Sequence, residues 1–399
     1  MVNYTIKRSN YEEIIENWLW YIYNIIYPII TWFLIGIIIN KDLINVFSLT
    51  YPLQCLMGII ISIFGVGANV SGIRDKNKNS ANNGILYGII ISIILFGLIA
   101  LNSKHYINFM NMNEDIYLIF CTYSILQILL QTVLYLILTK LYYLELNKKA
   151  NKISFLFNII NFITLISIAF VTKNQLLTSI ITLFILAIFD IILFVKIIDK
   201  IDFKLNLKNC FKYDSVSCSM NFMYFIIYLF GLSNSFSFGE KYVVAITFAT
   251  LITDIQWDVS AAVKNVAKID IVKEKFDYIE HFKNAIKFTL LLIISVILMG
   301  LIIYPIYNPN LLIVCIFIFL HIIDFAMTPF KNIKMCYLEI EYSPTKTTIN
   351  TIIAYIIRTV ISLLPTPFCT IMGQICSSVY ELIYAKVTYR KFKKIAKVT

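Results

Sequence analysis

Charged residues are scarce in this sequence, at 14% of its 399 residues, and only 12 glycines and 8 prolines are present. A soluble domain carries roughly 25% charged residues and more turn-forming residues. Hydrophobic residues make up 59% of the chain, and the mean hydropathy is +0.78. The charges occur in clusters between apolar runs long enough to span a bilayer as helices. The sequence therefore excludes an ordinary soluble domain and predicts a helical polytopic membrane protein.

Several chemical signatures are also missing. None of the eight cysteines forms a C-x-x-C pair, so neither a metal site nor a disulfide framework is predicted. No G-x-x-x-x-G-K-[ST] motif occurs, which argues against ATP-driven pumping by this chain. The stretch "DIQWD" (254–258) has the acidic spacing by which membrane prenyltransferases hold magnesium diphosphate, but a second such motif is missing. We therefore expect no enzyme, no catalytic residues, no bound metal and no cofactor.

The apolar runs predict twelve transmembrane helices. Their expected bounds are 18–39, 44–72, 85–101, 116–139, 153–171, 176–198, 215–238, 242–266, 286–307, 311–336, 347–364 and 367–385. A short segment, 1–17, precedes them, and a basic tail, 386–399, follows them. Each run is close to the roughly 20 residues that a membrane-spanning helix needs.

The basic residues predict the orientation of these helices. Four of the 34 lie in connections after odd-numbered helices, namely Lys41, Lys104, Lys173 and Lys241, and Arg358 lies inside a helix. The remaining 29 belong to the two termini and to the ends where even-numbered helices connect. Because Lys and Arg mark the cytoplasmic side, both termini are expected in the cytoplasm, in a multi-pass protein of the plasma membrane. Anionic lipid then accounts for the basic tail, and no nucleic-acid partner is required.

An internal repeat divides the chain. The stretch "ISIILFGLIA" (91–100) is identical to "ISVILMGLII" (294–303) at seven of ten positions, and "YLELNKKANK" (143–152) matches "YLEIEYSPTK" (337–346). A shorter match pairs "FDII" with "YELI", so that Asp190 corresponds to Glu381. The members of these three pairs lie 203, 194 and 191 residues apart. Such similar spacings predict two pseudo-symmetric six-helix bundles in the same orientation, which is the architecture of many transporters.

The predicted bundles are an N-lobe, 18–205, and a C-lobe, 206–385, with a central cavity between them. Three stretches resemble the multidrug and toxic compound extrusion (MATE) transporters, a family within a superfamily that also contains oligosaccharide flippases. The segment 45–73 looks like the family's long second helix, "ELNKKANKISFLFNIINFI" (145–163) like the turn into its fifth helix, and 243–267 like its eighth. The resemblance implies efflux of amphipathic or cationic compounds, driven by inward flow of protons or sodium ions.

Some positions depart from the family pattern. No acid occurs on the first helix, and in the Asn-x-x-x-Asp motif of the fifth helix Asn158 is present while Phe162 replaces the acid, with Asn161 beside it. The resemblance assigns Asp324 to the acid of the tenth helix. The seventh helix has no acid inside the membrane, so acids on the eighth helix would have to compensate for it.

The eighth helix, 242–266, carries two such acids, Asp254 and Asp258, four residues apart. They share a small, polar stripe, which we expect to face the cavity, with Thr247, Thr250, Ala261 and Asn265. Acids at a helix centre cost about 2.5–3.5 kcal/mol on insertion scales, and a pair at this spacing is coupled. The pair could bind either of two cations, and the sequence favours neither. One is a proton, and the other is a sodium ion held together with Thr250 or Gln256.

We therefore predict a cation-coupling cluster of Asp254, Asp258 and Asp324. Supporting polar positions are Gln256, Thr250, His321, Asn158, Asn161, Asp190 and Arg358. Structural roles stay open for several of them: Asp258 could pair with Lys264 or His321, and buried asparagines hold helices together.

Two functions follow from the sequence. The first is a monomeric secondary active exporter of organic cations in contact with membrane lipid. The alternative is a flippase for a lipid-linked oligosaccharide, whose cavity would need many Arg and Lys side chains, whereas only Arg358 lies within a predicted span's core. A passive channel is a third and less favoured interpretation.

Overall fold

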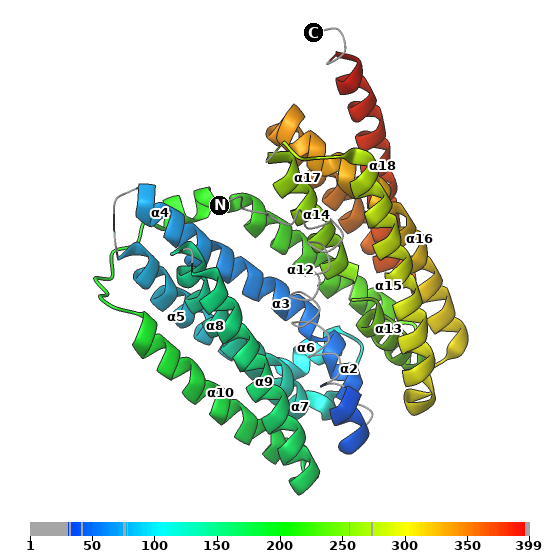
Figure 1. Ribbon diagram of the computed structural model, residues 1–399. Coiled ribbons are helices and arrows are strands. Elements are labelled where there is room, and N and C mark those ends of the chain that lie inside the picture. The colour runs from blue at the N-terminus through cyan, green and yellow to red at the C-terminus, as the bar shows by residue number, and fades with distance from the viewer. Residues whose placement is uncertain are drawn as a thin grey trace, which may run out of the picture. The chain divides into compact units, whose positions relative to one another are not determined.

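A computed structural model describes residues 31, 33–40, 43–74, 77, 79–144, 146–254, 256–272 and 274–395 of the chain (Figure 1). All regular structure that these residues form is helical. The chain divides into two compact units: the N-terminal unit, which ends at Thr247, and the C-terminal unit, which begins at Phe248. The predicted first helix, 18–39, lies largely outside the described residues, and residues 33–38 of it are helical.

The N-terminal unit contains the helices from α2 to the first part of α13. They are α2 (Leu43–Ser48), α3 (Thr50–Ile60), η1 (Ile61–Gly67), α4 (Ala68–Arg74), α5 (Ser80–Leu101), α6 (Ser103–Phe109), η2 (Glu114–Ile116), α7 (Tyr117–Phe120), η3 (Cys121–Leu126), α8 (Gln127–Tyr143), α9 (Asn147–Thr172), α10 (Gln175–Ile197), α11 (Leu207–Tyr213), α12 (Ser215–Phe236) and α13 (Glu240–Thr253). Leucine and phenylalanine side chains of α8, α9 and α10 form an apolar core in this unit.

The C-terminal unit continues from Phe248 in α13. Its further helices are α14 (Gln256–Val272), α15 (Tyr278–Tyr307), α16 (Leu311–Tyr337), η4 (Leu338–Tyr342), α17 (Pro344–Ser362) and α18 (Cys369–Ile395). Within this unit α18 packs against both α16 and α17, and α14 packs against α16. α16 is therefore in contact with both α14 and α18, and α17 is in contact with α18.

Tight turns with asparagine caps join the antiparallel helices in both units. Lys173 ends α9 with a φ of 49°, and the Asn174 side chain accepts a hydrogen bond from the Leu177 backbone N–H at the start of α10. Asn308 ends α15 with a φ of 43°, and Asn310 caps α16 in the same way. Asparagine tolerates both the left-handed conformation and the cap position, so polar residues at these points fix where each helix begins and ends.

Eight helices among the described residues are long and apolar enough to cross a membrane. They are Asn45–Arg74, Ser80–Leu101, Glu114–Tyr142, Lys149–Thr172, Gln175–Ile197, Ser215–Phe236, Tyr278–Tyr307 and Leu311–Tyr342. Each coincides with a predicted span, and the predicted spans 347–364 and 367–385 are also helical, as α17 and α18. The fold class is confirmed: the chain is an all-α polytopic membrane protein.

The eighth predicted helix is wrong in one respect. A single helix over 242–266 was expected, but α13 ends at Thr253 and α14 begins at Gln256. The Thr253 hydroxyl donates to the carbonyl oxygens of Ala249 and Thr250, at 3.0 and 3.2 Å. Such back-bonding can bend a helix, although Thr132 and Thr182 make the same kind of bond within continuous helices. The predicted stripe from Thr247 to Asn265 therefore does not lie on one continuous helix.

The predicted lobe boundary at 205/206 stays a prediction. The segment around it, 198–206, is tied to the N-terminal unit by the asparagines that surround the start of α5. The Asn83 amide donates to the Lys204 carbonyl at 2.8 Å and to the Asp202 carboxylate, and its oxygen accepts from the Asp202 backbone N–H at 3.1 Å. Tyr87 donates to the carbonyl of Phe203, whose φ is 61°. The segment before α11 is thus held in one conformation.

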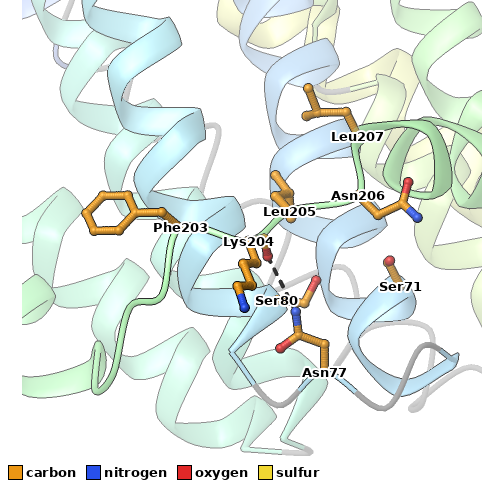
Figure 2. A pocket seen from close by; sticks show the side chains of 8 residues that line it. All are labelled: Ser71, Asn77, Ser80, Phe203, Lys204, Leu205, Asn206 and Leu207. Atoms are coloured by element: carbon orange, nitrogen blue, oxygen red, sulfur yellow. Dashed lines mark hydrogen bonds between the residues drawn. The ribbon is translucent and has the colours of Figure 1, made fainter.

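A cavity of about 760 Å³ lies under this segment (Figure 2). Its lining residues are Ser71, Asn77, Ser80, Phe203, Lys204, Leu205, Asn206 and Leu207. The Asn77 side chain is one of the lining residues and donates to the Lys204 carbonyl at 3.4 Å. This polar group of the cavity lining therefore helps to hold the segment.

Candidate functional site

Asp324 lies in the middle of α16 and is almost fully buried, with 1% of its surface exposed. The helix is otherwise apolar around it, in the sequence "IFIFLHIIDFAMTPF" (316–330). An acid at such a position is costly unless other groups stabilise it, so the partners of Asp324 decide what it does.

Three side chains donate hydrogen bonds to the Asp324 carboxylate. The Gln374 amide donates to Oδ2 at 2.7 Å, and the Gln256 amide donates to the same oxygen. The Ser378 hydroxyl donates to Oδ1. Gln256 comes from α14, and Gln374 and Ser378 come from α18, so Asp324 joins three helices of the C-terminal unit. All three partners are donors, which fits an ionised carboxylate because such a group only accepts hydrogen bonds.

Gln256 reaches Asp324 from the start of α14. Gln256 is the first residue of α14, directly after the interruption that follows Thr253. A discontinuous helix inside a membrane exposes polar groups where they can line a site, and transporters use such breaks at ion sites. The sequence "TDIQWD" (253–258) therefore contributes Gln256 to the group around Asp324.

A buried cation flanks Asp324 on one side. Arg358 of α17 is 5% exposed and donates through Nη2 to the Gln374 side-chain oxygen at 3.0 Å. Gln374 thus bridges the guanidinium and the carboxylate. A glycine at 373 permits this approach: a Cβ there would lie 2.7 Å from the Arg358 carbonyl oxygen and 2.7 Å from the Ser362 hydroxyl.

A second cation flanks Asp324 on the other side. Lys331, also on α16, donates to the Ser378 hydroxyl at 2.6 Å and forms an ion pair with Glu381 of α18 at 3.1 Å. The side chains of Lys331 and Glu381 are 15% and 18% exposed. Charges of opposite sign therefore alternate through the group, in the order Arg358, Asp324, Lys331 and Glu381.

His321 lies one turn before Asp324 and is buried between aromatic rings. Its ring centroid is 4.9 Å from that of Phe317 and 5.8 Å from that of Phe325. Within the described part of the chain, its Nδ1 atom has no hydrogen-bond partner. This environment fits a packed neutral imidazole, so a proton relay through His321 stays a prediction.

The structure places the two aspartates of the eighth helix less fully. Asp254 is partly buried at the break between α13 and α14, and Thr250 lies one turn earlier in α13. Asp258 lies on α14, and its side chain is outside what the structure describes. The predicted cluster of Asp254, Asp258 and Asp324 stays a prediction; the described partners of Asp324 are neutral donors.

The remaining predicted residues lie in the N-terminal unit. Asn158 and Asn161 are on α9 and Asp190 is on α10. Asp190 is 3% exposed, and among the described residues neither of its carboxylate oxygens has a hydrogen-bond partner. Asn161 is also buried, and its side-chain oxygen has no partner in the same part of the chain.

The sequence interpretation missed Gln374, Ser378 and Lys331. A signal exists for the last helix: Gln374, Ser378 and Glu381 occur at positions i, i+4 and i+7 in "GQICSSVYE" (373–381), which places them on one helix face. No comparable signal marks Lys331, since a lysine near the cytoplasmic end of a helix is ordinary.

The group around Asp324 combines one carboxylate with neutral polar side chains. The Asp324 carboxylate and the Ser378 hydroxyl offer oxygen atoms, which hard cations prefer as ligands, while the two glutamines approach the carboxylate through their amide nitrogens. In the described residues no group of three His, Cys, Asp or Glu could hold a metal ion. One carboxylate with neutral oxygens suits a proton or a monovalent cation better than a divalent one.

Comparison with solved structures places the fold. The chain is similar to a multidrug resistance MATE family transporter of the MOP superfamily in its inward-facing conformation, with a TM-score of 0.65, 14% identity, and coverage of 93% of this chain and 96% of that one. It is also similar to the outward-facing conformation of such a transporter, with a TM-score of 0.59, 14% identity, and coverage of 97% and 98%.

A third similar structure is a MOP superfamily transporter from Pyrococcus furiosus, described as having a binding pocket of reversed polarity that suggests a different function. Here the TM-score is 0.62 at 15% identity, with 97% of each chain covered. No family model and no curated protein matches the sequence. At these identities the likeness concerns the fold, and it confirms the resemblance at that level: the chain has a fold like that of the solved MATE transporters.

Proposed function

We propose that this protein is a secondary active exporter of amphipathic or cationic compounds, driven by antiport of protons or sodium ions through Asp324. The observation that carries the proposal is a buried carboxylate held by neutral donors from α14 and α18 in the C-terminal unit. The fold supports it, because the similar structures include transporters solved in inward-facing and outward-facing conformations.

Asp324 is suited to couple a cation to a conformational change. Its partners come from α14 and α18, so a cation that binds to the carboxylate weakens hydrogen bonds that join these helices to α16. A ligand shifts two conformations only by its differential affinity for them. We therefore expect the cation to bind one arrangement of these helices more tightly, and the compound to leave from that state.

The substrate class is a finer part of the proposal. A flippase for a lipid-linked diphosphate would present free cationic side chains to its cargo. Here both cations near Asp324 are compensated, Arg358 through Gln374 and Lys331 by Glu381. This favours an uncharged or cationic cargo. We place the protein in the plasma membrane as a monomer with both termini in the cytoplasm, on the charge pattern of its loops.

The test is efflux of a fluorescent organic cation from energised vesicles, with a proton or sodium gradient imposed in turn. We expect one gradient to drive transport by the wild type. Asp324→Asn should lower the rate at least about 100-fold, because a neutral amide has no negative charge with which to bind the coupling cation. Asp254→Asn and Asp258→Asn in the same assay show whether these acids share the role.

Glu339→Gln is the matched control. It removes one carboxylate from the same unit, where Glu339 forms a surface ion pair with Lys268 at 2.8 Å, and transport should persist. Equal monodispersity of all variants in detergent separates loss of transport from loss of folding. A wild type that moves no cation under either gradient contradicts the proposal, and transport of a lipid-linked oligosaccharide should then be measured.

A further inference from the structure

Four charges of alternating sign lie close together in the C-terminal unit, and their sum is zero without any transported ion. Arg358 reaches Asp324 through Gln374, and Lys331 reaches it through Ser378. Lys331 in turn pairs with Glu381. A transported cation that enters this group adds a positive charge to a neutral, buried set, which is costly unless a resident cation moves away.

Lys331 is the resident cation that can move. Its Nζ atom already contacts both the Ser378 hydroxyl, at 2.6 Å, and Glu381, at 3.1 Å. Lysine carries its charge on a flexible stem, whereas the Arg358 guanidinium is planar, 5% exposed and hydrogen-bonded to Gln374. Glu381 also lies closer to solvent, at 18% exposure. The second acid therefore offers Lys331 an alternative position at small electrostatic cost.

We propose that Lys331 is a tethered counter-cation of Asp324, which a transported cation displaces toward Glu381 when it binds. The inference rests on the proposed function. In the empty state Lys331 holds Ser378 against the carboxylate; in the loaded state the cation takes the carboxylate and Lys331 pairs with Glu381 alone. When the cation is a proton, an O–H bond forms on Asp324 and Lys331 keeps its own protons.

Lys331 is thus a positioning residue that sets the affinity for the coupling cation by competing with it. The charged and titratable side chains described around Asp324 are His321 and Lys331 on α16, Arg358 on α17 and Glu381 on α18, while α14 contributes the neutral Gln256. Because Lys331 and Glu381 have opposite effects on the competition, their removal should shift the cation affinity in opposite directions.

The experiment measures the half-saturating concentration of the coupling cation in two ways. Sodium binding to the purified protein is followed by titration calorimetry at constant ionic strength, and the pH at which a carboxyl becomes protonated is followed by infrared difference spectroscopy. Lys331→Met should lower the half-saturating cation concentration about tenfold, since the competitor is gone. Glu381→Gln should raise it, because Lys331 then has Asp324 as its nearest carboxylate.

Two further variants keep the result specific. Lys331→Arg retains the charge and should stay within about twofold of the wild type. Lys334→Met removes the same charge three residues along α16, beside Lys386 and Arg390, and should leave the cation affinity unchanged. A shift of the same sign in Lys331→Met and Glu381→Gln, an equal shift in Lys334→Met, or no shift in Lys331→Met overturns the inference.

Direct binding separates this inference from the proposed function. If wild-type protein binds neither sodium nor a proton at a carboxyl, the proposed coupling fails and the inference fails with it. If the wild type binds a cation, Asp324→Asn abolishes binding, and Lys331→Met binds as the wild type does, the inference alone is wrong.

Discussion

Two aspartates, Asp324 and Asp190, are almost equally buried and lie in helices long enough to span a membrane, yet their surroundings differ. Asp324 accepts hydrogen bonds from three side chains on two other helices. Asp190 lies beside Phe189 and Leu186 in the apolar core of α8, α9 and α10, and its oxygens have no partner among the described residues. Burial alone therefore does not define a functional acid.

The difference has a physical consequence for the charge of each group. An ionised carboxylate is stable in a membrane protein when donors and nearby cations compensate its lost hydration. Asp324 has both, so it suits exchange between a bare and a cation-bound state. Neither carboxylate oxygen of Asp190 has a donor in the described part of the chain, and we expect this residue to fold as a neutral carboxylic acid. The groups around Asp324 therefore stabilise a charged side chain, whereas the surroundings of Asp190 accommodate a neutral polar one.

The internal repeat sharpens this contrast. Asp190 corresponds in sequence to Glu381, and both were expected near the cytoplasmic ends of their helices. Glu381 has a lysine partner 3.1 Å away, whereas the matching region of α10 provides no partner in the described part of the chain. The two halves therefore differ in the partners of equivalent acids.

The same substitution at both aspartates should give opposite results. Asp324→Val should destabilise the protein by about 3–5 kcal/mol, because Arg358 and Lys331 lose the carboxylate that compensates them. Thermal unfolding of the detergent-solubilised protein, followed by intrinsic fluorescence, measures the change. A midpoint that equals that of the wild type would show that the charges around Asp324 are compensated by other groups.

Asp190→Val should stabilise the protein by about 1–3 kcal/mol, since it removes a buried polar group that has no hydrogen bonds. The same unfolding assay applies, and Asp190→Asn is the control, because it keeps a polar group of the same size in the core. Transport should continue in Asp190→Val. Loss of coupled efflux in a stable Asp190→Val protein would instead assign this acid a role in coupling.

The sequence could predict the fold because hydropathy and positive charge act locally. Eight predicted spans coincide with helices, and the acid of the tenth helix lies at the centre of the candidate site. The end of α13 at Thr253 was not predictable from hydropathy, which does not resolve a change of backbone within one apolar run. Gln256 at the start of α14 donates to Asp324, so the site itself differs from the continuous stripe that was expected.

The partners of each acid were harder to predict than the acids. Gln374 and Ser378 share one predicted face of the last helix, but only the structure shows that both donate to Asp324. The isolation of Asp190 likewise depends on which side chains α8 and α9 present to α10, which the period of one helix does not show. Helix packing, and not helix position, is the information that the sequence did not provide.

A third aspartate, Asp202, has donors but little burial, so it separates the two factors and should show the smallest effect. The Asn83 amide above all, then the Asn79 amide and the Lys204 backbone N–H, hold the pKa of Asp202 below its usual value. A lowered pKa in the folded state stabilises the protein above the ordinary carboxyl pKa, and this contribution is lost as the pH falls through the folded value. Asp202→Asn should therefore be slightly less stable than the wild type at neutral pH, and the difference should shrink below about pH 4.

Asp199→Asn, in the same segment and exposed beside Lys140, is the control. A difference that persists unchanged in acid would mean that Asp202 acts through the shape of its hydrogen bonds and not through its charge.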